Sequence, residues 1–316
     1  MRTFTVLFVL AASAFAQSGA AERTISSESD VRTIVFAKDG SLSGLCADGK
    51  VRIWDAATGK LRKTVTPSQG ERILALNAGS AGALGKTSLR LWDFSADSAR
   101  DLVEAPSRVR TMAVAPDRNL FAATGPSFDR GSEETIRVWD DSGQQKFAAP
   151  AGIGGTSALA FSPKGDVVVA SSYDTDVRAY STRNGELLKR IDQLKVAVFA
   201  MQFSPDGKYL ATAGVDRIVY LWDTKTWQVA KRITGQPEMI RSLSFSPDGR
   251  YLITGGFSEL TTRHPVEIIL WDVASGKMVK RVPAPNAVGS VAFSPDGMTM
   301  AAALGGKSVS LWSVPR

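Results

Sequence analysis

Seven side chains recur at one position of a repeating pattern, four residues before an aromatic or equivalent apolar residue. Four of the seven are arginines, whose guanidinium groups bind carboxylates and phosphates through paired, charge-assisted hydrogen bonds. A ring of such side chains would suit a carboxylate, a phosphate or an acidic peptide, and Arg108 could add to it. The alternative is that these arginines are solvated and paired with nearby acids such as Asp30 and Glu71. In chain order the seven residues are Arg32, Arg72, Arg110, Ser157, Phe199, Arg241 and Gly289.

The residue types present give little support to catalysis. His264 is the only histidine and Cys46 the only cysteine, which removes nearly every zinc or iron site built from those ligands. His264 beside Glu259 and Arg263 could act as a general base, but a lone histidine on an insertion is far more often a surface residue. The sequence therefore predicts no catalytic residue, no cofactor and, calcium apart, no metal.

Calcium is the one metal that the acidic residues leave open. Carboxylate oxygens occur together in Asp174-Thr-Asp176, and again at Asp129 with Glu133 and Glu134. Neither run has the full oxygen-ligand spacing of a calcium loop, so the sequence does not decide whether calcium is bound.

Internal repeats define the elements that must position these residues. The segment Phe203-Ser-Pro-Asp-Gly207 recurs at 245–249 and 293–297, with weaker copies at 161–165, 36–40 and 114–117. A second marker follows each copy by about twenty residues, an apolar run that ends in Trp-Asp or a degenerate form of it. Since the aromatic residues are spaced by 38 to 49 positions, the chain contains seven units. They are Trp54, Trp92, Trp139, Tyr180, Trp222, Trp271 and Trp312.

Each unit predicts four short antiparallel strands. Alternating apolar residues before the Phe-Ser-Pro-Asp-Gly segment indicate strand a, as in 240–245. The proline, aspartate and glycine then form a hairpin turn, because they fix φ, cap the turn and accept positive φ respectively. Strands b, c and d follow, for example at 209–213, 218–222 and 227–233.

These residues resemble the WD-repeat β-propeller family, and the resemblance covers residues 21–316. It implies an all-β, seven-bladed β-propeller of four-stranded antiparallel blades. The chain lacks the Gly-His dipeptide before strand a, so the family's buried His–Ser–Trp–Asp network cannot be complete in any blade. Asp48, Asp174 and Asp216 occupy the family's aspartate position, whereas Lys86 and Gly306 replace it in blades 2 and 7.

The resemblance also predicts how the ring closes. The seventh unit ends at Val314-Pro-Arg316, just after strand c, and so lacks a strand d of its own. The segment Glu22–Ser26 precedes the first strand a and is expected to pair into blade 7, which would remove the open edges.

In such propellers the d–a and b–c loops lie on one face around the channel, and the arginine position lies at that rim. The b–c loops of blades 3 and 6 are enlarged, at 126–134 and 257–265. Such insertions commonly carry binding, although neutral elongation of the surface is the alternative. The predicted partner-binding residues are Arg32, Arg72, Arg110, Phe199 and Arg241.

The first sixteen residues are expected to lie outside the fold. Arg2 precedes a short apolar run, and Ala14-Phe15-Ala16 has the small-x-small pattern that signal peptidase recognises. Residues 1–16 are therefore predicted to be a signal peptide and 17–316 the propeller, periplasmic or secreted, with no transmembrane segment in the mature chain. An uncleaved N-terminal anchor is the alternative.

The net charge of +7 does not require a nucleic-acid partner. Much of the excess falls on strands d, the outer edge of each blade, where lysine and arginine discourage edge-to-edge pairing. We therefore expect a monomeric, exported binding scaffold that captures a protein partner, an acidic peptide or a glycan. The alternative is a hydrolase or lactonase-like enzyme that acts at the channel mouth.

Overall fold

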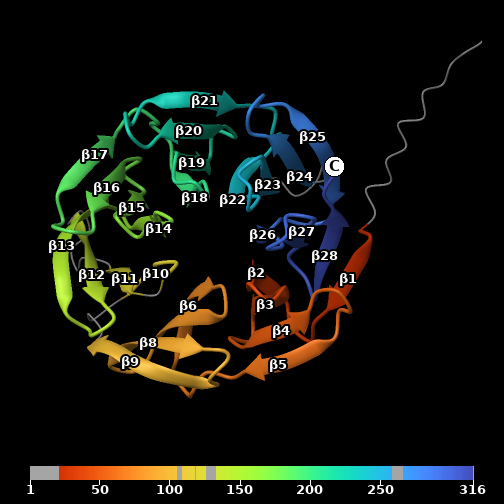
Figure 1. Ribbon diagram of the computed structural model, residues 1–316, viewed down its shortest axis with the longest axis horizontal. Coiled ribbons are helices and arrows are strands. Elements are labelled where there is room, and N and C mark those ends of the chain that lie inside the picture. Colours follow the sequence, from red (N-terminus) through yellow and green to blue (C-terminus); the bar gives the residue numbers. More distant parts are fainter. Residues whose placement is uncertain (1–20, 105–108, 118, 126–132, 258–265, 316) are drawn as a thin grey trace, which may run out of the picture.

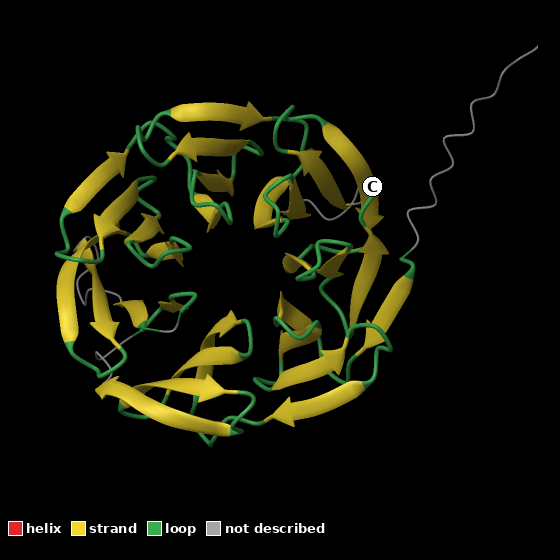
Figure 2. Ribbon diagram, in the orientation of Figure 1, coloured by secondary structure: helices red, strands yellow, loops and turns green. Residues whose placement is uncertain are grey.

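The alternating apolar residues of each unit form β-strands whose two faces are both covered by neighbouring units. The computed structural model describes residues 21–104, 109–117, 119–125, 133–257 and 266–315. In these ranges the strands form seven four-stranded antiparallel sheets, arranged as blades of a ring (Figures 1 and 2). The predicted seven-bladed propeller is therefore confirmed. No helix in the described ranges is long and apolar enough to cross a membrane.

In blades 1 to 6 the strands run in sequence order from the ring's axis outward, whereas the outermost strand of blade 7 comes from the N-terminal part of the chain (Figure 1). Blades 1 and 2 consist of β2 (Val31–Phe36), β3 (Ser41–Cys46), β4 (Val51–Asp55) and β5 (Leu61–Val65), then β6 (Arg72–Asn77), β7 (Ser80–Leu84), β8 (Ser88–Asp93) and β9 (Ser98–Glu104). Blades 3 and 4 consist of β10 (Thr111–Val114), β11 (Leu120–Gly125), β12 (Glu133–Asp140) and β13 (Gln145–Ile153), then β14 (Thr156–Phe161), β15 (Val167–Ser172), β16 (Val177–Ser181) and β17 (Leu187–Ile191). Blades 5 and 6 consist of β18 (Val198–Phe203), β19 (Tyr209–Gly214), β20 (Val219–Asp223) and β21 (Val229–Ile233), then β22 (Met239–Phe245), β23 (Tyr251–Phe257), β24 (Val266–Asp272) and β25 (Met278–Ala284). Blade 7 consists of β26 (Ser290–Phe293), β27 (Thr299–Ala303), β28 (Ser308–Ser313) and β1 (Arg23–Ser26).

The N-terminal strand closes the ring as the sequence predicts. β1 pairs antiparallel with β28, so that Arg23 lies opposite Leu311 and Ser26 opposite Ser308. Ile25 on this strand is only 1% exposed and packs in the core between blades 7 and 1. The outermost strand of blade 7 is thus supplied by the other end of the chain.

The a–b turn of blade 5 shows why the Ser-Pro-Asp-Gly segment forms a hairpin. The Ser204 hydroxyl donates to the Asp206 carboxylate at 2.6 Å and accepts the Tyr209 amide at 2.9 Å. Gly207 has a φ of 72°, a conformation that glycine adopts without strain. Blade 2 has no such segment, and only Ala78 and Gly79 separate its strands β6 and β7.

Basic side chains on the outer strands join neighbouring blades, a role that the sequence does not reveal. Among the described residues, five of the seven junctions have an arginine or lysine that donates to a backbone carbonyl at or just after strand c of the next blade. Basic side chains on strand d, which discourage edge-to-edge pairing, therefore also form hydrogen bonds between neighbouring blades. The pairs are Arg23 to Ala56 at 2.7 Å, Lys63 to Phe94 at 2.9 Å, Arg100 to Asp141 at 3.0 Å, Lys231 to Val273 at 3.0 Å and Lys280 to Ser313 at 3.3 Å.

Candidate binding site

A hollow of about 830 Å³ lies on one face of the ring, where the innermost strands of several blades meet. We call it the mouth hollow and define it by two positions of the repeat. Strand a or the residue just before it contributes Arg32, Ser157, Phe199, Arg241 and Gly289. The second position, at the end of strand b or just after it, contributes Ala47, Tyr173, Phe257 and Gly305.

A backbone irregularity explains why the first set of side chains faces the hollow. In blades 1, 4, 5 and 6 the pairing of strand a with strand b shifts register at this one residue. A β-bulge of this kind re-aims the side chain of the extra residue away from the ladder. The residues at the four bulges are Arg32, Ser157, Phe199 and Arg241.

Arg32 and Arg241 are the two arginines of the mouth hollow, and Asp30 also lines it. Neither the Arg32 nor the Arg241 guanidinium has a hydrogen bond or ion pair with another residue in the described part of the chain. Arg241 instead lies over the Phe257 ring, with its guanidinium carbon 5.3 Å from the ring centre. Blade 7, which lies between them, has Gly289 and Gly305 at the two lining positions and so places no side chain at either of them. The exposed side chains of Arg32 and Arg241 therefore lie on either side of a blade that has glycine at both lining positions.

Arg72 and Arg110 are placed differently, and neither lines the mouth hollow. In blade 2 the bulge falls at Leu74, so Arg72 pairs in register with Leu84. Its guanidinium donates to the Val109 carbonyl at 3.0 Å. Arg110 lies 3.5 Å from a carboxylate oxygen of Glu134 and is thereby paired with an acid. Of the five predicted partner-binding residues, the structure brings Arg32, Phe199 and Arg241 together.

Tyr173 and Phe257 also line the hollow; the sequence did not single out Tyr173, and it marked Phe257 only as the first residue of the enlarged loop 257–265. Each follows directly on the strand b residue whose partner in strand a comes just before the bulge, the place that Ala47 occupies in blade 1. Tyr173 is 51% exposed, while Phe257 is partly covered by Arg241. Aligning the repeats at the end of strand b as well as at strand a would have revealed this second ring.

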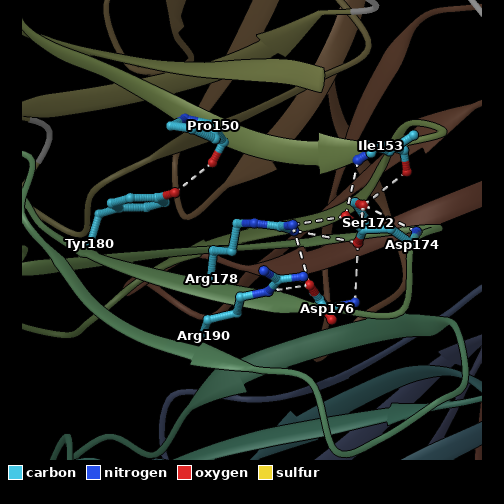
Figure 3. Close-up of polar contacts among 8 residues, drawn as sticks. All are labelled: Pro150, Ile153, Ser172, Asp174, Asp176, Arg178, Tyr180 and Arg190. Atoms are coloured by element: carbon cyan, nitrogen blue, oxygen red, sulfur yellow. Dashed lines mark hydrogen bonds and ion pairs between the residues drawn. The ribbon is translucent and has the colours of Figure 1, made fainter. Parts of the chain in front are cut away.

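The turn that carries Tyr173 is held by a cluster of ion pairs (Figure 3). The Arg178 guanidinium contacts the Asp174 carboxylate at 2.8 Å and the Asp176 carboxylate at 3.2 Å, and Arg190 contacts Asp176 at 2.5 Å. Burial raises the pKa of Asp174, but hydrogen bonds from Arg178 and Ser172 outweigh it and lower the pKa to about 2. Both carboxylates considered for calcium are thus engaged by arginine.

Glu134, from the second group of acids considered for calcium, is also already engaged by other residues. Its side chain is only 3% exposed, and one carboxylate oxygen accepts both the amide and the hydroxyl of Thr156 at 2.7 Å. Within the described ranges, no group of three or more His, Cys, Asp or Glu residues is arranged to hold a metal ion.

Several sequence predictions fall outside the described residues. These are the signal peptide at 1–16, Arg108, Asp129, the side chain of Glu133, the loop residues 126–132 and 258–265, and the candidate base His264 with Glu259 and Arg263.

The comparison with known families agrees with the fold. The family model described as WD domain, G-beta repeat (WD40) matches five segments that together cover more than half of the chain. No curated protein matches the chain. The unmatched stretch 56–149 contains blade 2, whose turn and bulge depart from the repeat, and nearly all of blade 3. The matched segments are residues 20–55, 150–181, 186–223, 227–259 and 276–313.

Proposed function

Because this chain belongs to the WD40 repeat family, whose propellers commonly serve as scaffolds for protein interactions, we propose that it is an exported binding scaffold. It captures a protein partner through an acidic segment that enters the mouth hollow. The observation that carries this proposal is the pair of guanidinium groups, Arg32 and Arg241, which lack an acidic partner in the described part of the chain.

The chemistry of the hollow supports an anionic ligand. A carboxylate that reaches Arg32 and Arg241 would form charge-assisted hydrogen bonds, which are about twice as strong as neutral ones. Phe199 and Phe257 add apolar surface beside the two cations. A volume of about 830 Å³ lies within the size range of small-ligand sites and could hold a few residues of a peptide.

Arg110 and Arg72 have a smaller part in this proposal. Arg110 is paired with Glu134, and Arg72 donates to a backbone carbonyl, so a ligand would have to compete with contacts that already exist. Ligand binding is therefore assigned to Arg32, Phe199 and Arg241.

The N-terminal sequence supports a location of this protein outside the cytoplasm. Arg2, the short apolar run and Ala14-Phe15-Ala16 support export, so the partner is expected in the periplasm or outside the cell. Nucleic acids are then poor candidates, and acidic segments of envelope or secreted proteins are better ones.

Affinity capture from an envelope extract tests the proposal. The mature chain, residues 17–316, is immobilised as wild type, as R32E/R241E, and as the control R183E/K225E, which makes the same charge change on c–d turns. Wild type and control should retain the same protein, and R32E/R241E should lose it while keeping its Tm. Capture by R32E/R241E at the wild-type level would refute the assignment.

A further inference from the structure

The lip of the mouth hollow, formed by the residues at the end of strand b or just after it, is different at blade 4 from what it is at blades 1 and 7. Tyr173 projects there with half of its surface exposed, whereas blades 1 and 7 have Ala47 and Gly305 at the equivalent place. A tyrosine ring offers a large apolar surface with a polar end, a combination that is enriched at binding interfaces.

The backbone around Tyr173 is fixed to the preceding blade. The Tyr173 amide donates to the Gly155 carbonyl at 3.0 Å, and the Ser172 hydroxyl donates to the Ile153 carbonyl at 3.1 Å. The Ile153 amide in turn donates to the Asp174 carboxylate at 3.0 Å (Figure 3). The turn that carries Tyr173 is therefore attached to the end of β13 on both of its sides.

The same turn holds an unfavourable backbone conformation. Thr175 has a φ of 71°, which a β-branched residue rarely adopts, while blade 1 places Gly49 there with a φ of 80°. Such a conformation persists when surrounding contacts determine it. Asp174 supplies those contacts, since its carboxylate binds Arg178 and also accepts the Asp176 amide at 3.1 Å.

We propose that Tyr173 determines the specificity of the mouth hollow, and that the ion-pair cluster beneath it is a positioning device. The inference rests on the proposed function. Arg32 and Arg241 would bind the anionic group of a ligand, and the Tyr173 ring would contact a flat apolar group carried beside it. The preferred ligand is then an acidic peptide segment with an aromatic or large apolar side chain, and not a polyanion without apolar surface.

Phe199 and Phe257 favour this ligand over an acidic glycan. Both rings and Ala287 are partly exposed and can pack against an apolar side chain, whereas Thr33 and Ser157 are small uncharged side chains with few groups to hydrogen-bond the hydroxyls of a glycan.

Four small probes test the inference by calorimetry or NMR titration of the mature protein. They are 3-phenylpropionate, propionate, the neutral 3-phenylpropionamide and glucuronate. Wild type should bind 3-phenylpropionate most tightly. Y173S should raise its Kd about tenfold, Y173F should leave it within about twofold, and neither should change the Kd of propionate. S172A, which removes the Ile153 contact, should weaken 3-phenylpropionate about threefold and leave propionate unchanged, because it loosens only the ring's position.

The outcomes separate the two proposals. An unchanged Kd for 3-phenylpropionate in Y173S, with binding lost in R32Q/R241Q, would overturn the role of Tyr173 and leave the proposed function in place. Glucuronate binding as tightly as 3-phenylpropionate would also overturn it, in favour of an acidic glycan. Wild type that binds no anionic probe, or R32Q/R241Q that binds as wild type does, would overturn the assignment of the arginines and this inference with it.

Discussion

Blades 4 and 6 are copies of one repeat, but different polar interactions hold the strand c aromatic residue and its surroundings in the two blades. In blade 6 the Trp271 indole donates to the Thr254 hydroxyl at 2.8 Å, and that hydroxyl donates to the Gln236 side-chain carbonyl at 2.7 Å. In blade 4 Tyr180 replaces the tryptophan, and the buried Arg178 binds Asp174 and Asp176. One blade is held by a neutral chain of hydrogen bonds and the other by ion pairs.

The comparison shows which of the two departures from the family's polar network affects the candidate site. Gln236 follows Gly235 and takes the place of the histidine that the family's Gly-His dipeptide would supply, so the chain of blade 6 is a substitute for the family's network. The ion pairs of blade 4 lie under the lip of the mouth hollow and fix the turn that carries Tyr173. Blade 4 departs further from the repeat, and the ion pairs that replace the network there bear on the candidate site through this turn.

Blade 1 shows that the ionic arrangement is not confined to one blade. Arg52, with a side chain 3% exposed, contacts Asp48 at 2.8 Å and Glu28 at 3.1 Å. It stands two residues before Trp54, as Arg178 stands two residues before Tyr180. Blade 1 has Ala47 at its lip, so a buried arginine alone does not imply an aromatic residue there.

The largest expected effect comes from breaking the ionic cluster of blade 4. Arg178→Met should lower the free energy of unfolding by about 3–5 kcal/mol, because it leaves two carboxylates with little exposure and no buried cation between them. Urea denaturation measures the loss. Arg183→Met, at an exposed turn of the same blade, is the control and should change it by less than about 0.5 kcal/mol. A loss of under 1 kcal/mol in Arg178→Met would mean that the cluster does not hold the blade.

A smaller effect is expected from the neutral chain of blade 6. Thr254→Val should cost about 1–3 kcal/mol, because the Trp271 indole N–H and the Gln236 carbonyl both lose their buried partner. Thr254→Ser keeps the hydroxyl and should cost less than half as much in the same urea titration. Equal losses in the two variants would show that the methyl group, and not the hydrogen bonds, matters at this position.

The repeat predicted the fold because its signals are local. Phe-Ser-Pro-Asp-Gly turns and strand c aromatics specify hairpins and blade packing within about forty residues, and the unpaired last unit required a strand from Glu22–Ser26.

The residues at the rim were predicted less completely than the fold. Arg72 was chosen by counting four residues back from Leu76, which assumes that the bulge lies at the same distance in every blade. The a–b turn of blade 2 has only two residues, and the bulge falls at Leu74. Arg72 therefore does not occupy the bulge position that faces the hollow.

The polar clusters could not be predicted from the repeat alone. The arginine two residues before the aromatic is visible in the sequence at Arg52, Arg90, Arg137 and Arg178. Which acids it meets depends on how a turn folds back and on contacts with the preceding blade, such as that between Ile153 and Asp174. These are tertiary relations that neither spacing nor composition contains.

Acid titration should distinguish blade 4 from blade 6. The pKa of Asp174 is lowered from 3.8 to about 2 in the folded chain, so its ionised form stabilises the fold. That stability is present above about pH 4 and is lost as the pH falls towards 2. Asp174→Asn should therefore be less stable than wild type at pH 5, and the difference in Tm should narrow between pH 4 and pH 2. A difference that stays constant over this range would contradict the lowered pKa.

Blade 6 should show a smaller effect of opposite sign. Burial raises the pKa of Glu267, Arg281 partly offsets this, and the nearby Glu238 raises it further. Because the folded pKa is raised, the stabilisation that Glu267 gives is present below its unfolded pKa and is lost as the pH rises through the folded value. Glu267→Gln should therefore raise the Tm by about 1–2 °C at pH 7 and leave it unchanged at pH 4. The ion pair with the half-exposed Arg281, at 3.3 Å, is worth too little to reverse the sign. A lower Tm for Glu267→Gln at pH 7 would show that blade 6, like blade 4, depends on an ion pair.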